Sequence, residues 1–199
     1  METHGPPRQF VGTSRSKSSN DLYVSLLRSI VYQQLAGAAA SAIWRRFVAL
    51  CSNPQEPTPE EVLQLDEKNL RDAGLSARKQ SYILSASQYA KDGHLSLDTL
   101  SEMQDDDIIE VLTRIKGIGP WSAHMLLIFG LGRMDVLPVG DLGLRKGFSV
   151  HFGMQKLASA EEMIERSQHW RPYRSLRCLY MWHIGHLFNK KKTLRPQYW

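Results

Sequence analysis

The sequence predicts an all-α protein, and three observations lead to this prediction. Apolar residues recur at helical spacing from about residue 22 almost to the end of the chain. Runs that alternate apolar and polar residues are absent, as are Asn-Gly hairpin turns, so nothing favours strands. Several apolar segments also begin at a capping residue or a proline and end at a glycine, which are the start and stop signals of helices.

The N-terminal part is predicted to be a flexible leader followed by two helices. Residues 1–20 are rich in proline, glycine and serine and show no apolar periodicity. Gly37 lies near the end of the first helix or in the turn to a second, alanine-rich helix that reaches Leu50. The apolar stripe of the first helix consists of Leu22, Leu26, Leu27, Ile30 and Val31.

Four further helices are predicted in the middle of the chain after a loop at residues 52–59. Thr58-Pro59-Glu60-Glu61 combines the spacing of a capping box with a proline at the first helical position. The segments LDEKNLRDAG and LSARKQSYILSASQYAKDG each end in glycine, as helices often do. Three aspartates at residues 105–107 then favour the start of a helix that runs to about Ile115.

The C-terminal part is predicted to hold four helices. Pro120 opens the first of them, which reaches about Phe129, because a missing N–H does no harm in a first turn. Asp141 precedes a short helix, and Ser159 to Glu162 form a second capping box. Pro172 begins the last helix, whose apolar residues are Leu176, Leu179, Tyr180, Trp182, Ile184 and Leu187.

Composition narrows the class of protein. A chain of 199 residues suits one domain or two small lobes. Its two cysteines, Cys51 and Cys178, cannot form a disulfide framework, a four-thiolate zinc site or an iron-sulfur cluster, so a reducing compartment is expected. No apolar run matches a membrane span or a secretory signal, and we expect a soluble, intracellular protein. The net charge of +5 and a pI near 9.3 favour an anionic partner such as nucleic acid.

A turn of four residues, Lys116-Gly117-Ile118-Gly119, joins two predicted helices and indicates a helix-hairpin-helix. Glycine permits positive φ and leaves the backbone uncovered, so the turn can present N–H groups to a phosphate oxygen at the start of the next helix. Ile118 would fill the gap between the helices, and such a contact would read no bases. The alternative is an ordinary pair of turns in which Gly117 only ends one helix and Gly119 precedes the next.

Four segments together resemble the helix-hairpin-helix DNA glycosylase superfamily, within it the alkylpurine branch of the 3-methyladenine DNA glycosylase II type. They are SIVYQQLAGAAASAIWRRF, IKGIGPWSAHM, DVLPVGDLGLRKGF and WRPYRSLRCLYMW, and the resemblance covers roughly residues 21–188. It implies two helical subdomains with the active-site cleft between them. Within a domain at 21–199, the central subdomain would span about 36–134, and the N- and C-terminal helices would form the second. The resemblance does not include the N-terminal β-domain that some members carry, so a minimal, all-helical catalytic core is expected.

The resemblance places the catalytic aspartate of the family on Asp141. A carboxylate at a helix N-terminus is favoured in its ionised form, and a negative charge stabilises the oxocarbenium-like sugar that forms as the base leaves. Asp141 would stabilise that cation and orient or activate water, two roles that the sequence does not separate. It is also a plain N-cap, and the two readings are compatible. Asp135 is the nearby rival and lacks the preceding glycine.

The resemblance also implies the base pocket and the type of chemistry. Trp121 and Trp182 match tryptophans of the alkyl-base glycosylases and would stack on a flipped, cationic base, with Tyr32 as a weaker candidate. Met125 lies where the family often has tyrosine, a departure that affects the shape of the pocket. Members that also cut the strand carry a lysine at the position of Trp121, so hydrolysis without lyase activity is expected. The competing interpretation is that both tryptophans belong to the core.

Contacts to DNA are expected at three further places. The turn after the first helix would supply the wedge that replaces the flipped base, and Gln34, with its neighbour Leu35, matches it best, although Gln34 is nearly as well explained as a surface residue. Arg145, Lys146 and the lysines at 190–192 could contact phosphates. A monovalent cation, Na⁺ or K⁺, could bind main-chain carbonyls of the hairpin. Those carbonyls would belong to Thr113, Ile115 and Ile118.

The expected protein is therefore a monofunctional, monomeric DNA glycosylase that excises alkylated purines, chiefly 3-methyladenine, from double-stranded DNA. It would need no cofactor other than the possible cation, and it would work in the nucleus of a eukaryote or the cytoplasm of a prokaryote. His183 and His186 lie one turn apart without a third ligand, so no transition metal is expected. Two alternatives stay open: a non-catalytic helix-hairpin-helix module that only binds DNA, and a purely structural helical protein.

Overall fold

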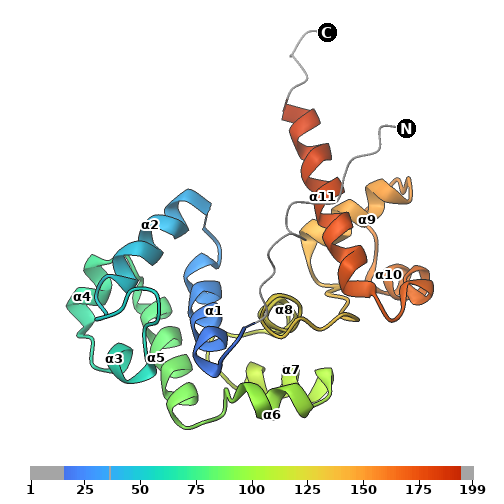
Figure 1. Ribbon diagram of the computed structural model, residues 1–199. Helices are drawn as coiled ribbons and strands as arrows, with labels where there is room; N and C mark the ends of the chain where they lie inside the picture. The colour runs from blue at the N-terminus through green and yellow to red at the C-terminus, as the bar shows by residue number, and fades with distance from the viewer. Residues whose placement is uncertain (1–15, 36, 194–199) are drawn as a thin grey trace. The chain divides into compact units, whose positions relative to one another are not determined.

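The computed structural model describes residues 16–35 and 37–193, with side chains up to Leu187, and within these ranges it contains helices and no strand (Figure 1). The all-α prediction is confirmed. Most of the predicted leader at residues 1–20 and the side chains of the lysines at 190–192 lie outside the described part. In that part, no helix is both long and apolar enough to cross a membrane.

The described residues divide into two compact units, 16–131 and 132–193. The elements of the first unit are α1 (Ser19–Tyr32), α2 (Gly37–Val48), α3 (Pro59–Leu63), α4 (Glu67–Asp72), α5 (Ala77–Lys91), α6 (Leu97–Glu102), α7 (Asp105–Thr113), α8 (Pro120–Met125) and the π-helix η2 (Leu126–Gly130). Those of the second unit are α9 (Leu142–His151), α10 (Ala160–Arg166), the 3₁₀ helix η3 (Gln168–Trp170) and α11 (Arg174–Thr193).

The capping signals of the sequence decide where most helices begin. Thr58 starts α3 with a complete capping box, and Ser159 does the same for α10, both as predicted. The side chain of Ser18 accepts a hydrogen bond from the N–H of Asp21, so α1 begins at Ser19, earlier than the predicted leader allows. Gly74 and Gly93, which follow α4 and α5, have φ of +99° and +84°, where glycine avoids the steric cost of a Cβ.

Three further helices differ from the prediction. Residues 97–102 form α6, a two-turn helix too short to show apolar periodicity, although Ser96 caps it. The helix that starts at Pro120 widens into a π-helix from Leu126. Finally, α11 begins at Arg174 and not at Pro172.

The first unit is built around α1. Its stripe of apolar side chains is completely buried, and the helix packs against α5, α2 and η2. α1 thus belongs to the compact unit of residues 16–131. The reason is local, because the buried face of α1 meets the helices that follow it in the chain.

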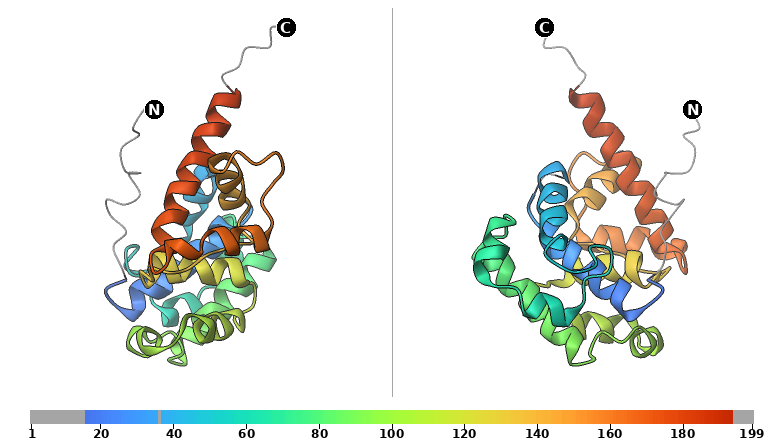
Figure 2. Two further views of the ribbon diagram at one scale, coloured as in Figure 1. Left: turned by 90° about the vertical axis from the view of Figure 1, so that its right-hand side faces the viewer. Right: turned by 60° about the vertical axis from the view of Figure 1, so that its left-hand side comes forward.

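The second unit is a small core between α9, α10 and α11. Figure 1 shows α9 beside α11, and the two further views in Figure 2 keep them side by side. Both cysteines are buried, and burial raises the pKa of the Cys51 thiol to about 11 and that of Cys178 to about 12, which suits packing residues. The buried residues of this core are Leu144, Phe148, Ala158, Met163, Trp170, Cys178 and Met181.

Candidate active site

Asp141 caps α9 and is held by two hydrogen bonds. The backbone N–H of Leu144 donates to its Oδ1 oxygen at 2.5 Å, which is the predicted N-cap. The indole N–H of Trp182 on α11 donates to the same oxygen at 2.6 Å. Both bonds are charge-assisted and fix the carboxylate in one orientation. The structure therefore brings together two residues that the sequence singled out for different roles, one for chemistry and one for stacking.

The Trp182–Asp141 contact exists because α9 and α11 approach closely. A Cβ on Gly147 would lie 1.7 Å from the carbonyl oxygen of Met181, so no side chain fits there. A Cβ on Gly185 would lie 3.2 Å from the carbonyl oxygen of Gly143. Sequence reasoning missed these glycines as part of the site. The sequence does carry one signal for the close approach. Gly143 and Gly147 are four residues apart, so they lie on one face of the helix that follows Asp141.

Asp135, the rival carboxylate, serves the structure of the second unit. Arg174 donates to its two carboxylate oxygens at 2.7 and 2.9 Å, and Arg171 donates at 3.1 Å. Burial acts to raise the pKa of Asp135, but the hydrogen bonds from Arg174 outweigh it and the pKa is lowered. Since two arginines occupy this carboxylate, Asp141 is the better candidate for catalysis.

Arg145, a predicted phosphate contact, is tied to its own unit. Its Nε donates to the carbonyl of Ala158 at 2.8 Å, and its side chain is partly buried. Lys146 is exposed. Arg145 therefore helps to fix the segment that precedes α10, and a contact to phosphate would be a second role.

The hairpin between α7 and α8 has the predicted form. Ile118 is 4% exposed, and its N–H donates to the carbonyl of Ile115 at 3.0 Å, so it fills the space between the two helices. Gly119 is the N-cap of α8 and has no side chain with which to cap it. The backbone at the start of α8 is thus left uncovered by side-chain caps, as a phosphate site requires.

The two glycines of the hairpin are there for different reasons. Gly117 has a φ of +85°, and a Cβ on it would lie 2.2 Å from the ring of Tyr82, so both conformation and packing demand glycine. Gly119 has a φ of −102°, and a Cβ on it would meet nothing within 4 Å. The fold alone does not require glycine at 119.

The turn after α1 presents the two predicted wedge residues. Gln34 is exposed, and Leu35 is 38% exposed, which is high for a leucine. The side-chain amide of the neighbouring Gln33 donates to the carbonyl of Gly117 at 3.1 Å. The turn and the hairpin, far apart in the sequence, therefore lie side by side within the first unit.

Tyr32 and Met125 line one cavity of about 210 Å³ in the first unit. The guanidinium of Arg28 lies 5.2 Å from the centre of the Tyr32 ring, and a hydrogen bond from Arg28 lowers the pKa of Tyr32. Trp121 is 44% exposed, so it is not a core residue, whereas Trp170 is buried. The other residues that line this cavity are Ser25, Ser29, Leu126, Phe129 and Gly130.

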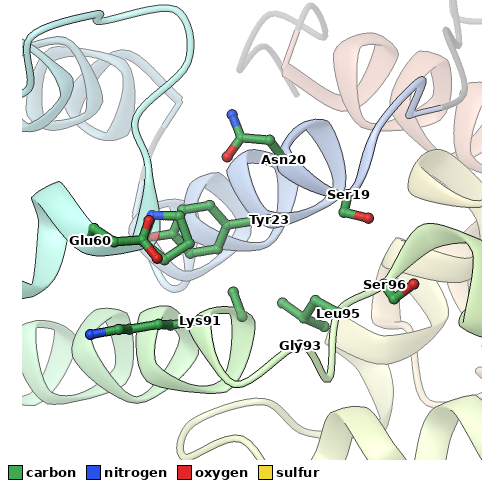
Figure 3. Close-up of a pocket in the computed structure, with 10 residues that line it drawn as sticks. Ser19, Asn20, Tyr23, Glu60, Lys91, Gly93, Leu95 and Ser96 are labelled. Carbon is green, nitrogen blue, oxygen red and sulfur yellow. The ribbon is translucent and has the colours of Figure 1, made fainter.

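A larger cavity of about 330 Å³ contains none of the predicted site residues (Figure 3). It lies in the first unit, where Tyr23, Glu60 and Lys91 are among its lining side chains. The hydroxyl of Tyr23 shares a 2.6 Å hydrogen bond with Ser87, and burial raises its pKa. These polar groups already have partners within the fold or face solvent, so the cavity offers no reactive group.

Metal-ligating side chains do not gather in the described part of the chain. No three His, Cys, Asp or Glu side chains there lie close enough to share an ion, and His183 and His186 sit on α11 without a third ligand. At the hairpin, the Ile115 carbonyl accepts a backbone hydrogen bond, and the Thr113 hydroxyl donates to the carbonyls of Ile109 and Glu110. A cation bound to the predicted carbonyls would share the Ile115 carbonyl oxygen with the N–H of Ile118, which already donates to it.

Comparison with known proteins identifies the family of the hairpin. Residues 27–172 match the family model described as HhH-GPD superfamily base excision DNA repair protein. Among curated relatives, DNA-3-methyladenine glycosylase 1 of Schizosaccharomyces pombe is 35% identical over 92% of this chain and 81% of the relative. The putative DNA-3-methyladenine glycosylase YfjP of Bacillus subtilis is 36% identical over 81% of this chain, which spans only 58% of that protein.

Solved structures give the same picture. The Schizosaccharomyces pombe 3-methyladenine DNA glycosylase Mag1, in complex with abasic DNA, matches with a TM-score of 0.76 and 34% identity over 88% of this chain and 87% of that one. A DNA-3-methyladenine glycosidase from Bacillus halodurans matches with a TM-score of 0.79 and 37% identity over 89% and 80% of the two chains. The hairpin, the Asp141 segment and the whole described fold thus agree with a single type of protein.

Proposed function

This chain belongs to the HhH-GPD superfamily of base excision DNA repair proteins, and we propose that it is a DNA-3-methyladenine glycosylase. It hydrolyses the N-glycosidic bond of alkylated purines in duplex DNA, chiefly 3-methyladenine, and leaves an abasic site. The observation that carries the proposal is the orientation of the Asp141 carboxylate by Leu144 and Trp182. Asp141 is the residue that the sequence resemblance matches to the family's catalytic aspartate.

Asp141 acts on the sugar. As the bond between C1′ and the purine nitrogen breaks, its electron pair leaves with the base and C1′ becomes cationic. A purine methylated at N3 or N7 is itself a cation, so it departs as a neutral molecule and needs little further help. The carboxylate stabilises the sugar cation, water adds to C1′, and the surplus proton passes to the carboxylate or the solvent. One well-oriented negative charge is sufficient for such a leaving group.

Aromatic side chains select the base. A nucleobase must leave the stack before it can be excised, and a cationic base is attracted to an indole face by roughly 0.5 to 2 kcal/mol. Trp121 offers an exposed indole for this purpose, while Tyr32 and Met125 line a cavity in the same unit. The ring of Trp182 is already oriented by its bond to Asp141, so its first role is to position the carboxylate.

The hairpin and the turn after α1 hold the duplex. Gly117, Ile118 and Gly119 present backbone to a phosphate, and Gln34 with Leu35 occupies the space of the flipped base. These contacts are independent of sequence. Arg145 adds positive charge, a cation at the Thr113, Ile115 and Ile118 carbonyls would steady the hairpin, and the protein works as a monomer. It acts where DNA is kept, in the nucleus of a eukaryote or the cytoplasm of a prokaryote.

Strand cleavage is not part of the proposed activity. The position at which lyases of the superfamily carry the Schiff-base lysine is occupied here by Trp121, and an indole cannot form that adduct. The product is therefore an intact strand with one abasic site.

Base release tests the proposal directly. Duplex DNA treated with a methylating agent is incubated with the protein, and the released bases are separated by chromatography. We expect free 3-methyladenine, with strands that break only after alkali. Binding to the duplex without any base release would favour the non-catalytic module, and covalent trapping of the protein on DNA by borohydride would contradict the absence of lyase activity.

A further inference from the structure

The turn between α1 and α2 has an unusual backbone. Gln34 has a φ of +58° and is the one non-glycine residue with positive φ in the described part of the chain. This conformation is sterically unfavourable for a residue with a Cβ, and such residues persist only where the surroundings hold them. Gln34 is also exposed, so its own side chain does not secure the turn by packing. The N–H of Leu35 closes the turn on the carbonyl of Tyr32 only at 3.4 Å, so a further group is needed to hold the backbone firmly in this form.

Lys79 on α5 is that group. Its ammonium donates to the carbonyl of Val31 at 2.5 Å and to the carbonyl of Gln33 at 2.9 Å. The lysine is partly buried, and desolvation lowers its pKa, so the two carbonyls replace water around the charge. Carbonyls at the C-terminus of a helix carry partial negative charge, which makes this end of α1 a favourable place for a cation. Both accepting carbonyls precede Gln34 in the chain. The two bonds therefore fix the direction in which the backbone enters Gln34.

The same face of α5 supports the hairpin. Tyr82, one turn after Lys79, packs against Gly117, and the hydroxyl of Ser85 accepts a hydrogen bond from the N–H of Lys116 at 3.3 Å. The amide of Gln33 then joins the turn to the Gly117 carbonyl. One helix therefore sets the position of the wedge turn relative to the phosphate-binding turn. All of these contacts lie within the first unit.

We propose that Lys79 is a positioning residue for base flipping, which holds the Gln33–Gln34 backbone so that Gln34 and Leu35 enter the duplex at a fixed distance from the hairpin. This inference rests on the proposed glycosylase function. Unstacking a base costs free energy, and a wedge that is already ordered loses less conformational entropy on insertion. Without the ammonium, Gln34 relaxes to an ordinary conformation and the wedge must be ordered again at each flipping event.

The test separates flipping from chemistry. A labelled strand of pyrimidines with a single adenine is methylated as a duplex, purified, and annealed to a fresh complement. The complement either places thymine opposite the adenine or lacks that nucleotide, so that the lesion is bulged and already partly unstacked. Single-turnover release is then measured for the wild type, Lys79→Met and Lys91→Met. Lys91 is an exposed lysine near the end of the same helix and serves as the matched control.

We expect Lys79→Met to slow release from the paired substrate about tenfold and from the bulged substrate less than twofold, because only the paired lesion needs the wedge. Lys91→Met should match the wild type on both. Equal losses on both substrates, or no loss on either, would overturn the inference. Wild-type protein that is inactive even on the bulged lesion would contradict the proposed function itself, and this inference with it.

A second variant covers the possibility that Lys79→Met does not fold. Gln33→Met keeps Lys79 and removes only the hydrogen bond between the turn and the Gly117 carbonyl. It should show the same selective loss on the paired substrate, about threefold, since one of the three side-chain hydrogen bonds that hold the turn is gone. A loss of equal size on the bulged substrate would contradict the inference. Lys79→Arg, which keeps the charge, should recover at least half of the rate that Lys79→Met loses.

Discussion

The segment around Asp141 and the hairpin between α7 and α8 use glycine in opposite ways. At Gly147 a side chain would collide with the backbone of α11, and the close packing that results brings the Trp182 indole to the Asp141 carboxylate. At Gly119 there is room for a side chain, yet the backbone is left bare. Contacts within its own unit therefore fix the conformation of the Asp141 segment. A Cβ on Gly119, in contrast, would meet nothing within 4 Å in the described part of the chain.

This difference reflects what each region does in the proposed function. A charge that stabilises a transition state must be oriented before the substrate arrives, so its neighbours are packed tightly around it. A phosphate contact is completed by the ligand, so the protein needs only accessible N–H groups and no obstruction. Substitutions in the first region should therefore change the chemical rate or the stability of its unit, while Gly119 should affect only binding.

The largest effect is expected at Asp141. Asp141→Asn preserves the shape of the side chain and an oxygen that can accept both hydrogen bonds, but it removes the negative charge. The single-turnover rate of 3-methyladenine release should fall by roughly 100- to 1000-fold, as expected for the loss of one electrostatic group in a catalytic site. Gel-shift titration should show duplex binding within about twofold of the wild type. A rate close to that of the wild type would remove Asp141 from the chemistry.

Gly147→Ala should break the tight region itself. The added Cβ would lie 1.7 Å from the Met181 carbonyl oxygen, and neither helix backbone can yield without separating α9 from α11. We expect a loss of about 3 kcal/mol in the free energy of unfolding, at the upper end for overpacking, together with loss of base release. Gly140→Ala, where a Cβ meets nothing within 4 Å, is the stability control. Equal denaturation midpoints for the two variants would show that the contact is not as close as described.

Trp182→Phe should have a smaller effect on the same carboxylate. It keeps an aromatic ring and removes the N–H that donates to Asp141 at 2.6 Å. Because hydrogen bonds to charged groups contribute roughly 1.5 to 3 kcal/mol, the single-turnover rate should fall about tenfold or more. Trp170→Phe, in the core of the same unit, should change the melting temperature and leave the rate nearly unaltered. If both substitutions change only stability, Trp182 does not position Asp141.

Asp135 tests whether the rival carboxylate is structural. Its pKa is lowered in the folded state, so the stabilisation it provides is present above the unfolded pKa of about 4 and is lost as the pH falls through the folded value. Asp135→Asn should cost about 1 kcal/mol of stability at neutral pH, since the ion pairs are partly exposed. Urea titrations should show this difference shrinking below about pH 4. A stability difference between wild type and Asp135→Asn that grows at acid pH would contradict a structural role for the ionised Asp135 carboxylate.

Gly119→Ala should produce the smallest effect, and one confined to binding. Its φ of −102° is allowed for alanine and no atom lies near the new Cβ, so the melting temperature should not change. A methyl group between the backbone and a phosphate should weaken duplex binding about fivefold, equally for every sequence. Gly117→Ala, in contrast, should lower stability because of its positive φ and the Tyr82 ring. An unchanged affinity for Gly119→Ala would argue against the hairpin as the phosphate anchor.

Much of the fold follows from local signals in the sequence. Thr58 and Ser159 form the predicted capping boxes because their partners lie three residues away, and the Asp141 cap is equally local. The short helix α6 and the π-helix η2 were missed because neither has a distinct periodicity. Local patterns therefore indicate where helices start, but not how a helix widens or which unit it joins.

The sequence predicts which residues belong to the candidate site, but it does not predict which of them contact one another. Asp141 and Trp182 lie 41 positions apart, and only the packing of α9 on α11 through glycine makes them partners. Lys79 carries no motif that distinguishes it from the other lysines of the chain, and its role depends on carbonyls 46 and 48 positions away. Long-range contacts of this kind cannot be derived from periodicity, because periodicity reports only which face of a helix is buried.

The most direct test of the division between these two regions is the dependence of the single-turnover rate of 3-methyladenine release on protein concentration. The account predicts that Asp141→Asn lowers the plateau rate and leaves the half-saturating concentration unchanged. Gly119→Ala should raise the half-saturating concentration and leave the plateau unchanged. A plateau that survives in Asp141→Asn, or one that falls in Gly119→Ala, would contradict it.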